Sequence, residues 1–224
     1  MKEDRKNQPK EYFKFLAKRA RPLFENLKNP TVLDIGCATG DFIYYLKDRF
    51  PYAEFTGSDV VQTMIDNAQK KYPDTKFINM DITNDSTFPS HKYDIIFMSG
   101  VIYLFEDFKP WINNLKKLLT PQGKAFVFSN YNPEPIDMIL HVNPVDENYP
   151  GKGSVSYFSK KRLGNYLNEI NAKFEFIDWE ITIPLEKKEN DPLRSWTIKD
   201  EHGKYLLVSG MQFIQTCGVL EISF

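Results

Sequence analysis

The chain has 224 residues, of which 42% are hydrophobic and 26% charged, and its formal net charge at pH 7 is −1. These values are typical of a single globular domain with a sizeable core. The small net charge gives no general attraction to nucleic acid or to an anionic membrane. No apolar run approaches the roughly 18 residues of a membrane-spanning helix, and the polar N-terminus lacks the features of a secretion signal. We therefore expect a cytoplasmic protein, monomeric or homodimeric, without nucleic-acid or membrane partners.

The first predicted elements are helical. Between residues 11 and 27 apolar side chains recur every three or four positions, which indicates an amphipathic helix. Pro22 falls inside this run and is expected to divide it into two short helices, because proline lacks an amide hydrogen and clashes with the preceding turn.

The segment around which the rest of the chain is organised follows Pro30 and reads TVLDIGCATGD. Its first residues predict a short buried strand that ends at Asp34, and residues 36–40 form a loop of small side chains. Asp41 is expected at the N-cap or in the first turn of the next helix. Gly36 and Gly40 allow the backbone to approach a ligand closely. A strand, a small-residue loop and a helix in this order indicate the ligand-binding turn of an open α/β sheet.

The order Asp34-x-Gly36-x-Ala38-x-Gly40 resembles motif I of the class I S-adenosylmethionine (SAM) dependent methyltransferases, which usually have Gly where this chain has Ala38. The resemblance implies that Asp34 and the loop contact the methionine end of SAM. It also implies that residues 1–30 form a helical cap over the SAM pocket. The loop residues predicted to bind the cofactor are Gly36, Cys37, Ala38 and Gly40.

An NAD(P)-dependent oxidoreductase is the first alternative. Its dinucleotide fingerprint, G-x-G-x-x-G, would require Gly at the positions of Ala38 and Asp41. The carboxylate of Asp41 would also face the pyrophosphate that such proteins bind at the helix N-terminus, whereas a cationic sulfonium tolerates an acid there. Both observations favour SAM.

Acids end the next two predicted strands. Asp59 closes the strand at residues 54–59 and lies 19 residues beyond Gly40, the spacing at which such folds present a carboxylate to a ribose. The structural alternative is an Asp that caps the helix over residues 61–72. Val60, beside Asp59, is included in the predicted cofactor site. After the strand at residues 76–80, the resemblance implies that Asp81 binds the adenine amino group, with Ile82 supplying an amide and an apolar contact.

Residues 93–98 form the most clearly buried strand, which suits a central parallel position. The resemblance places Ser99 and Gly100 beneath the methyl donor. Tyr103 and Glu106 are then the first side chains that could face a substrate; the alternative for both, which is stronger for Glu106, is a surface loop.

The remaining elements complete the sheet. A helix over residues 111–119, a turn at residues 120–123 and a strand at residues 124–130 continue the alternation, and Ser159 is expected to cap another helix. Residues 174–184 and 205–224 resemble the family's terminal antiparallel hairpin. We therefore predict an α/β fold with a doubly wound, mostly parallel seven-stranded sheet. Its expected order is 3-2-1-4-5-7-6, with the last strand antiparallel and helices on both faces.

Residues 131–158 lack a sustained period and are predicted to form a lid or substrate insert at the carboxyl edge of the sheet. A hydroxyl acceptor benefits from a base. We expect the catalytic residues among His141, Tyr131 and Tyr103, with Asp146 and Tyr157 as further candidates. The competing interpretation of His141 is an ordinary surface histidine.

The predicted function is methyl transfer from SAM to a small molecule, at oxygen, by a single domain spanning residues 1–224. Ser99-Gly100-Val101-Ile102 stands where a motif typical of enzymes that methylate nitrogen in bases and amides would be expected, which slightly favours an oxygen acceptor. We predict no bound metal, and we expect Cys37 and Cys217 to be reduced and unpaired. A SAM-binding protein without catalytic activity is the second alternative.

Overall fold

The computed structural model describes residues 8–146, 153–189, 191 and 193–224. Its helices are α1 (Glu11–Asn26), α2 (Asp41–Arg49), α3 (Gln62–Lys71), α4 (Lys109–Leu118) and α5 (Lys160–Glu169), with short 3-10 helices η1 (Asp85–Thr87) and η2 (Ile102–Leu104). Its strands are β1 (Thr31–Ile35), β2 (Glu54–Asp59), β3 (Lys76–Asn79), β4 (Tyr93–Ser99), β5 (Leu119–Asn132), β6 (Met138–Val142), β7 (Gly153–Ser159), β8 (Lys173–Asp178), β9 (Trp196–Lys199), β10 (Tyr205–Val208), β11 (Ile214–Gln215) and β12 (Cys217–Ser223).

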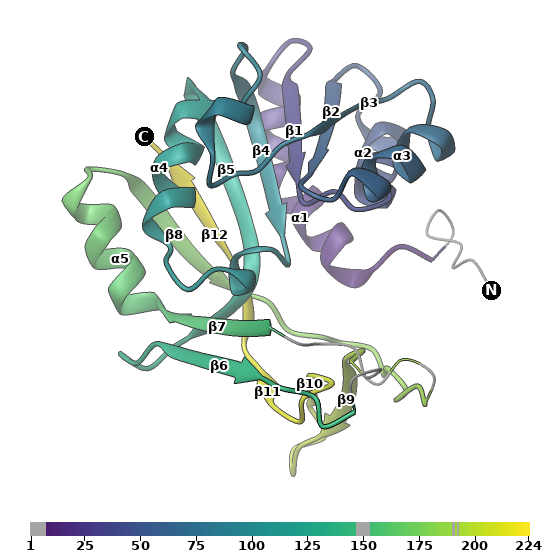
Figure 1. The fold of residues 1–224 in the computed structure, drawn as a ribbon, viewed down its shortest axis with the longest axis vertical. Coiled ribbons are helices and arrows are strands. Elements are labelled where there is room, and N and C mark those ends of the chain that lie inside the picture. Colours follow the sequence, from purple (N-terminus) through teal and green to yellow (C-terminus); the bar gives the residue numbers. More distant parts are fainter. Residues whose placement is uncertain (1–7, 147–152, 190, 192) are drawn as a thin grey trace.

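The main sheet has the order β3-β2-β1-β4-β5-β12-β8 (Figure 1). The pairs from β3 through β5 are parallel, whereas β12 runs antiparallel to both β5 and β8. Because β8 and β12 are the sixth and seventh strands expected from the sequence, the predicted order is confirmed. The carboxyl ends of β1, β2 and β4 meet at one edge, which is where ligands bind in open α/β sheets.

Two apolar clusters cover the two faces of this sheet. One contains Trp111 and Leu115 of α4 and Leu163 of α5, and the other contains Leu16 of α1 and Leu46 of α2. Side chains alternate between these clusters along β5, with Val127 and Tyr131 on the first side and Phe126 and Phe128 on the second. Helices therefore flank both faces, as the doubly wound fold requires.

Pro22 does not divide α1, which is one continuous helix from Glu11 to Asn26. The expectation of two short helices was wrong because it ignored tertiary packing. Leu16, Ala20 and Phe24 are fully buried on either side of the proline, so one apolar stripe runs the length of the helix. Burial of that stripe offsets the lost backbone hydrogen bond.

The turn expected at residues 120–123 is also absent, because this segment lies within β5. Tyr93 pairs with Leu119, and the next pair joins Ile95 to Lys124, so the intervening residues bulge out of the parallel register. A proline and a glycine in this segment mark the bulge, and they had suggested a turn between helix and strand.

The insert after β5 is more regular than its sequence indicated. β6 and β7 form an antiparallel hairpin, and β7 joins β5 in parallel through Tyr131 and Phe158. The polar connection before the C-terminal run contains β9, which forms a separate sheet with β10 and β11. β8 ends at Asp178, earlier than expected. Ser159 caps α5 as expected, since its hydroxyl accepts a hydrogen bond from the Arg162 amide. No helix in the described ranges is both long and apolar enough to cross a membrane.

Candidate functional site

The loop after β1 adopts backbone angles that favour small residues. Gly36, Ala38 and Gly40 all have positive φ angles, of 73°, 46° and 78°. A Cβ atom on Gly36 would lie 2.3 Å from Cγ2 of Val101, so a larger residue could not occupy this position without a shift. The amides of Gly36 and Cys37 both donate to the carbonyl of Ser58, at 2.8 and 2.9 Å, which ties the loop to β2.

Asp59, at the end of β2, closes the other side of this loop. Its Oδ2 atom accepts a hydrogen bond from the Ala38 amide at 3.0 Å, and its Oδ1 atom accepts one from the Val61 amide at 2.9 Å. Each carboxylate oxygen has a further lone pair that can accept a hydroxyl. Val60 follows with 63% of its surface exposed, so an apolar side chain stands beside the acid at the edge of the sheet.

Asp34 lies behind the loop and is almost fully buried, with 3% of its surface exposed. Burial, together with the nearby charge of Asp59, raises the pKa of the Asp34 carboxyl to about 8. Within the described ranges no donor bonds to this carboxylate. A buried acid of this kind is stabilised either by a proton or by a cationic ligand. Burial also raises the pKa of the Cys37 thiol, so this residue stays protonated and contributes packing.

Asp41 is the first residue of α2, and Gly40 is the N-cap. Burial acts to raise the pKa of its carboxyl, but hydrogen bonds from Lys71 and Tyr72 outweigh that effect and hold the pKa below its ordinary value. Asp41 is therefore an ionised acid at the N-terminus of α2. A pyrophosphate at this terminus would face its charge, which weakens the dinucleotide alternative further.

The loop after β3 holds the third predicted acid, Asp81. Its Oδ1 atom accepts hydrogen bonds from the amide and the hydroxyl of Thr83, both at 2.8 Å. The hydroxyl of Thr87 bonds to the Asp81 backbone, which folds the loop back on itself. The predicted side-chain contact of Ile82 with a ligand ring is not supported, because that side chain is 3% exposed and lies in the core.

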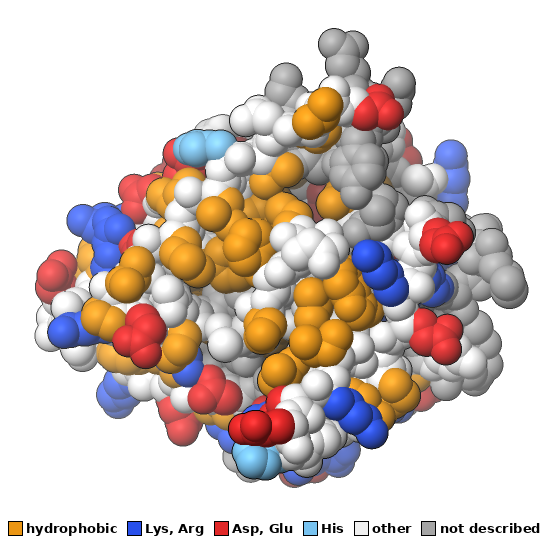
Figure 2. All heavy atoms as spheres, turned by 90° about the horizontal axis from the view of Figure 1, so that it is seen from below, with side chains coloured by type: hydrophobic (Ala, Val, Ile, Leu, Met, Phe, Trp, Pro, Cys, Tyr) orange, Lys and Arg blue, Asp and Glu red, His pale blue; other side chains and the backbone are white. Residues whose placement is uncertain are grey.

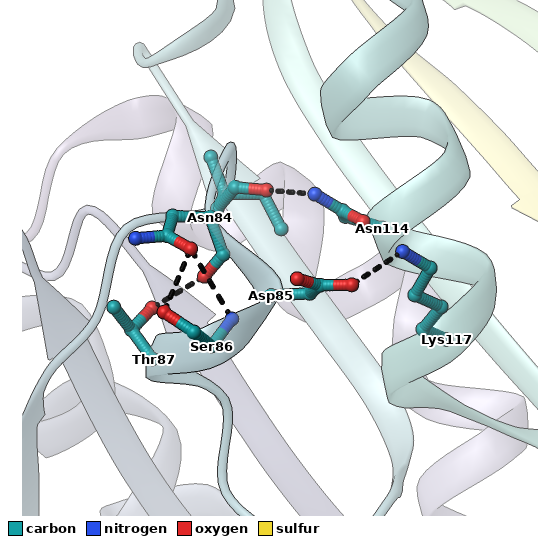
Figure 3. A network of polar contacts seen from close by, with 7 residues as sticks. Asn84, Asp85, Ser86, Thr87, Asn114 and Lys117 are labelled. Carbon is teal, nitrogen blue, oxygen red and sulfur yellow. Dashed lines mark hydrogen bonds and ion pairs between the residues drawn. The ribbon is translucent and has the colours of Figure 1, made fainter.

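Figure 3 shows how α4 holds the same loop. The side-chain amide of Asn114 donates to the Ile82 carbonyl at 2.8 Å, and this asparagine is itself buried. Lys117 forms an ion pair of 2.8 Å with Asp85 on the exposed side of the loop. The position of Asp81 thus depends on side chains from a helix that does not itself carry a predicted site residue.

The end of β4 supplies the small residues of the site. The hydroxyl of Ser99 is buried and has no hydrogen-bond partner in the described part of the chain, and the Gly100 amide donates to the Phe128 carbonyl at 2.9 Å. The ring of Tyr103 lies 3.9 Å from the place that a Cβ atom on Gly100 would occupy. Burial raises the pKa of Tyr103, so its hydroxyl keeps its proton and suits a hydrogen-bond donor better than a base.

Tyr131 does not reach the site, and the prediction that it acts as a catalytic base was wrong. Its side chain is fully buried in the core, and its hydroxyl donates to the Val127 carbonyl at 2.8 Å. The sequence placed Tyr131 just beyond a strand that was expected to end at residue 130. In the structure β5 continues to Asn132 and β7 covers this end, so Tyr131 is an interior strand residue.

Two other predicted residues come together at the insert. Nδ1 of His141, on β6, lies 3.8 Å from Oε1 of Glu106, which follows η2. Both side chains are more than half exposed. Asp146 is also exposed. Tyr157 instead is buried, and burial raises the pKa of its hydroxyl while the polar side chain of Gln215 opposes this shift.

Three aromatic side chains, Tyr12, Phe128 and Trp179, form a cluster that was not predicted from the sequence. The ring of Tyr12 stacks on Phe128 at 4.9 Å, and Trp179 meets Phe128 edge-on at 5.4 Å. These residues come from α1, from β5 and from the segment after β8. Sequence separation hid their proximity, although the alternation along β5 does place Phe128 on the α1 side.

The side chains of the site within the part of the chain that the structure describes are of a few kinds. No three His, Cys, Asp or Glu side chains there lie close enough to hold a metal ion. Cys37 and Cys217 are both free thiols in the structure. The site instead combines a glycine-containing loop, three acids at the ends of adjacent strands and a small-residue strand end.

Comparisons with known proteins agree with this description. Residues 32–123 match the model of a methyltransferase domain family. The trans-aconitate 2-methyltransferase of Escherichia coli is 28% identical over 195 residues, covering 84% of this chain and 76% of the relative. A SAM-dependent methyltransferase from Clostridium acetobutylicum has a TM-score of 0.63 at 14% identity, covering 95% of this chain and 90% of its own. The amino pentose methyltransferase CalS10 from Micromonospora echinaspora has a TM-score of 0.62 at 11% identity, covering 96% and 91%. These two structures show a shared fold.

The fold, the site and the matched segment together define a methyltransferase that uses SAM as its cofactor. The matched domain, the relatives, and the mostly parallel sheet with its antiparallel last strand support a class I SAM-dependent methyltransferase.

Proposed function

We propose that this enzyme transfers the methyl group of SAM to an oxygen atom of a small molecule. The observation that carries the proposal is the link between Asp59 and Ala38, which fixes a carboxylate beside the glycine-containing loop and next to the buried Asp34. Residues 1–224 would act as one domain, with residues 1–30 as a cap and residues 131–158 on the acceptor side. A cytoplasmic location, a monomeric or homodimeric state and the lack of nucleic-acid partners stay predictions from the composition.

The residues at the carboxyl edge suit SAM by their chemistry. Asp34 is buried and has no donor among the described residues, which suits the cationic methionine end. Asp59 has lone pairs left for the ribose hydroxyls, and Asp81 is available to the adenine amino group. Val60 would provide an apolar contact, and the orphaned hydroxyl of Ser99 would gain a partner. The residues proposed to hold the cofactor are Asp34, Gly36, Cys37, Ala38, Gly40, Asp59, Val60, Asp81, Ser99 and Gly100, together with the backbone of Ile82.

When bound, SAM supplies an electrophilic methyl carbon: the acceptor oxygen forms a bond to it, the sulfur–methyl bond breaks and its electron pair returns to sulfur, which leaves S-adenosylhomocysteine. The chain's own contribution is to position the acceptor and to remove its proton. Holding the acceptor close and in line supplies most of the acceleration. His141 would take the proton through its free ring nitrogen, while Glu106 orients the ring from Nδ1 and balances the charge that forms.

Two observations support an oxygen acceptor. The residues after β4 lack the motif typical of enzymes that methylate nitrogen in bases and amides. The curated relatives act on trans-aconitate, a compound whose heteroatoms are all oxygen. Tyr103 would remain protonated and donate a hydrogen bond to the acceptor.

Calorimetric titration with SAM, S-adenosylhomocysteine and NADH tests the cofactor site, first on the wild type and then on Asp59→Ala. We expect micromolar binding of both adenosyl ligands, loss of that binding in the variant and no binding of NADH. Conversion of SAM to S-adenosylhomocysteine in the presence of oxygen acceptors would then separate an enzyme from a SAM-binding protein without activity. Binding of NADH alone would contradict the proposal.

A further inference from the structure

The loop after β1 is held from two sides. β2 holds one of them, as described above, and the end of α3 holds the other. There the hydroxyl of Tyr72 donates to Oδ1 of Asp41 at 2.8 Å, and the ammonium of Lys71 forms an ion pair with the same oxygen. We call Asp41, Lys71 and Tyr72 the Asp41 cluster. It joins the end of α3 to the first residue of α2, directly after Gly40.

The ring of Tyr72 packs against the loop itself. A Cβ atom on Gly40 would lie 3.2 Å from Cδ2 of Tyr72 and 2.7 Å from Cζ of Phe77, so both rings limit the space around the glycine. Tyr44 of α2 stacks on Tyr72, with ring centroids 4.8 Å apart, and this contact fixes the orientation of the Tyr72 ring. Tyr72 therefore contacts the loop twice, through its ring at Gly40 and through its hydroxyl at Asp41.

The backbone of this loop needs such contacts. Gly36, Ala38 and Gly40 all have left-handed backbone angles, and Ala38 carries a side chain. A residue with a Cβ atom keeps these angles only where its surroundings hold it, because the Cβ atom crowds the neighbouring carbonyl oxygen. The loop is part of the proposed SAM site, so contacts that hold its angles also hold the shape of that site.

We propose that Lys71 and Tyr72 are positioning residues of the cofactor site: they act through Asp41 and Gly40 on the conformation of the loop, without contacting the cofactor. This inference rests on the proposed function, because it takes the loop as the SAM site. α2 and α3 lie at one end of the molecule (Figure 1), and β6 and the sheet of β9, β10 and β11 lie at the other, where Figure 2 shows hydrophobic side chains on the surface. Substitutions in the Asp41 cluster therefore leave that end unchanged.

The charge of Lys71 would act on SAM in the opposite direction. SAM carries a net positive charge because of its sulfonium, so a nearby ammonium repels it. If charge were the only effect, removal of Lys71 would tighten SAM binding; if Lys71 holds the loop, its removal weakens binding. S-adenosylhomocysteine separates the two effects, because it lacks the sulfonium charge but needs the same loop.

The test is calorimetric titration of the full chain with SAM and with S-adenosylhomocysteine, and urea unfolding shows that each variant is folded. Tyr72→Phe keeps the ring beside Gly40 and loses only the hydroxyl, so it should weaken binding of both ligands by about tenfold. Lys71→Met removes a partly exposed ion pair and should weaken binding of S-adenosylhomocysteine by about threefold. Lys71→Arg should restore the affinity, because residue 71 borders a hollow of about 380 Å³ that has room for the longer side chain.

Two further variants show whether the effect belongs to the Asp41 cluster. Lys71→Met should change nothing more in a protein that already carries Asp41→Asn, because both substitutions remove the same ion pair. Lys70→Met is the matched control, since Lys70 precedes Lys71 on α3 and is likewise exposed. It should leave the affinity for both ligands at the wild-type value.

Three results would overturn the inference while leaving the methyltransferase function intact. Tighter SAM binding in Lys71→Met, with unchanged affinity for S-adenosylhomocysteine, would show that Lys71 acts by its charge alone. Unchanged affinity for both ligands in Lys71→Met and Tyr72→Phe would mean that the Asp41 cluster serves only the stability of the fold. An equal loss in Lys70→Met would show that any lysine on this helix has the same effect. Failure of the proposed function is separate, since the wild type would then bind neither ligand.

Discussion

The backbone amide of Ala38 donates a hydrogen bond of 3.0 Å to Oδ2 of Asp59, and this bond joins the loop after β1 to the end of β2. The Val61 amide holds the other carboxylate oxygen at 2.9 Å. The acid is therefore fixed before any ligand arrives. Pre-organisation of this kind reduces the ordering cost of binding.

Replacement of Asp59 by Ala should abolish measurable SAM binding, because it removes the proposed acceptor for the ribose and releases the loop. It should also lower the free energy of unfolding by about 1–3 kcal/mol, since two backbone amides lose their partner. Asp59→Asn is the matched comparison. Its single carbonyl oxygen keeps one amide satisfied, so its stability should lie closer to the wild type while SAM affinity still falls at least about tenfold. Calorimetry and urea unfolding measure the two effects, and unchanged SAM affinity in both variants would contradict the assignment.

Asp34 should make stability fall as pH rises. The folded state holds this proton up to a pKa of about 8, whereas the unfolded chain releases it near 3.8. Unfolding therefore releases a proton between these values, and higher pH favours the unfolded state. Asp34→Asn removes this proton release on unfolding. The variant should therefore gain stability relative to the wild type as pH increases from 4 to 9. Urea unfolding across that range checks the slope, and parallel curves would show that Asp34 is already ionised.

The same residue predicts proton release on binding. A cationic ligand beside Asp34 favours its ionised form, so SAM binding near pH 7 should expel a proton from the wild type but not from Asp34→Asn. Calorimetric titrations with SAM in buffers of different ionisation enthalpy measure the number of protons released on binding. Equal proton release in both proteins would place the titrating group elsewhere.

Asn114 should influence cofactor affinity without touching the cofactor. Asn114→Leu leaves the buried Ile82 carbonyl without its donor, which should cost about 1–3 kcal/mol of stability. Because the same bond holds the Asp81 loop, SAM affinity should also fall several-fold. Lys117→Met is the control, since it removes only an exposed ion pair to that loop and should change little. Equal effects of both substitutions would show that the loop is held by other contacts.

Local signals in the sequence were sufficient to predict the strands and helices of the N-terminal half of the fold. β1 and β4 are short, mostly apolar strands, and β2 is marked by the acid that ends it. The residues proposed to bind the cofactor lie at these strand ends, which can be located in the sequence directly. The acceptor half depends on contacts between distant residues. Met138 and Ile139 on β6 are exposed, so the apolar residues of this strand do not indicate a buried face. Tyr131 is interior only because β7 extends the sheet beside it. Glu106 and His141 meet across 35 positions in the chain (141 − 106), a proximity that no local pattern indicates.

The pair formed by His141 and Glu106 yields the last prediction. If His141 removes the acceptor proton, His141→Asn should lower kcat by about 100-fold while the affinity for SAM stays unchanged, because the residue lies apart from the cofactor loop. Glu106→Gln should lower kcat less, by about tenfold, since it leaves the base in place and removes only the carboxylate that orients it. His202→Asn is the matched control. His202 is likewise exposed and lies 3.5 Å from a neighbouring glutamate, but it belongs to the turn between β9 and β10. Steady-state kinetics on all three variants decides the matter: equal kcat values would mean that the acceptor loses its proton to water, and that methyl transfer here depends on proximity alone.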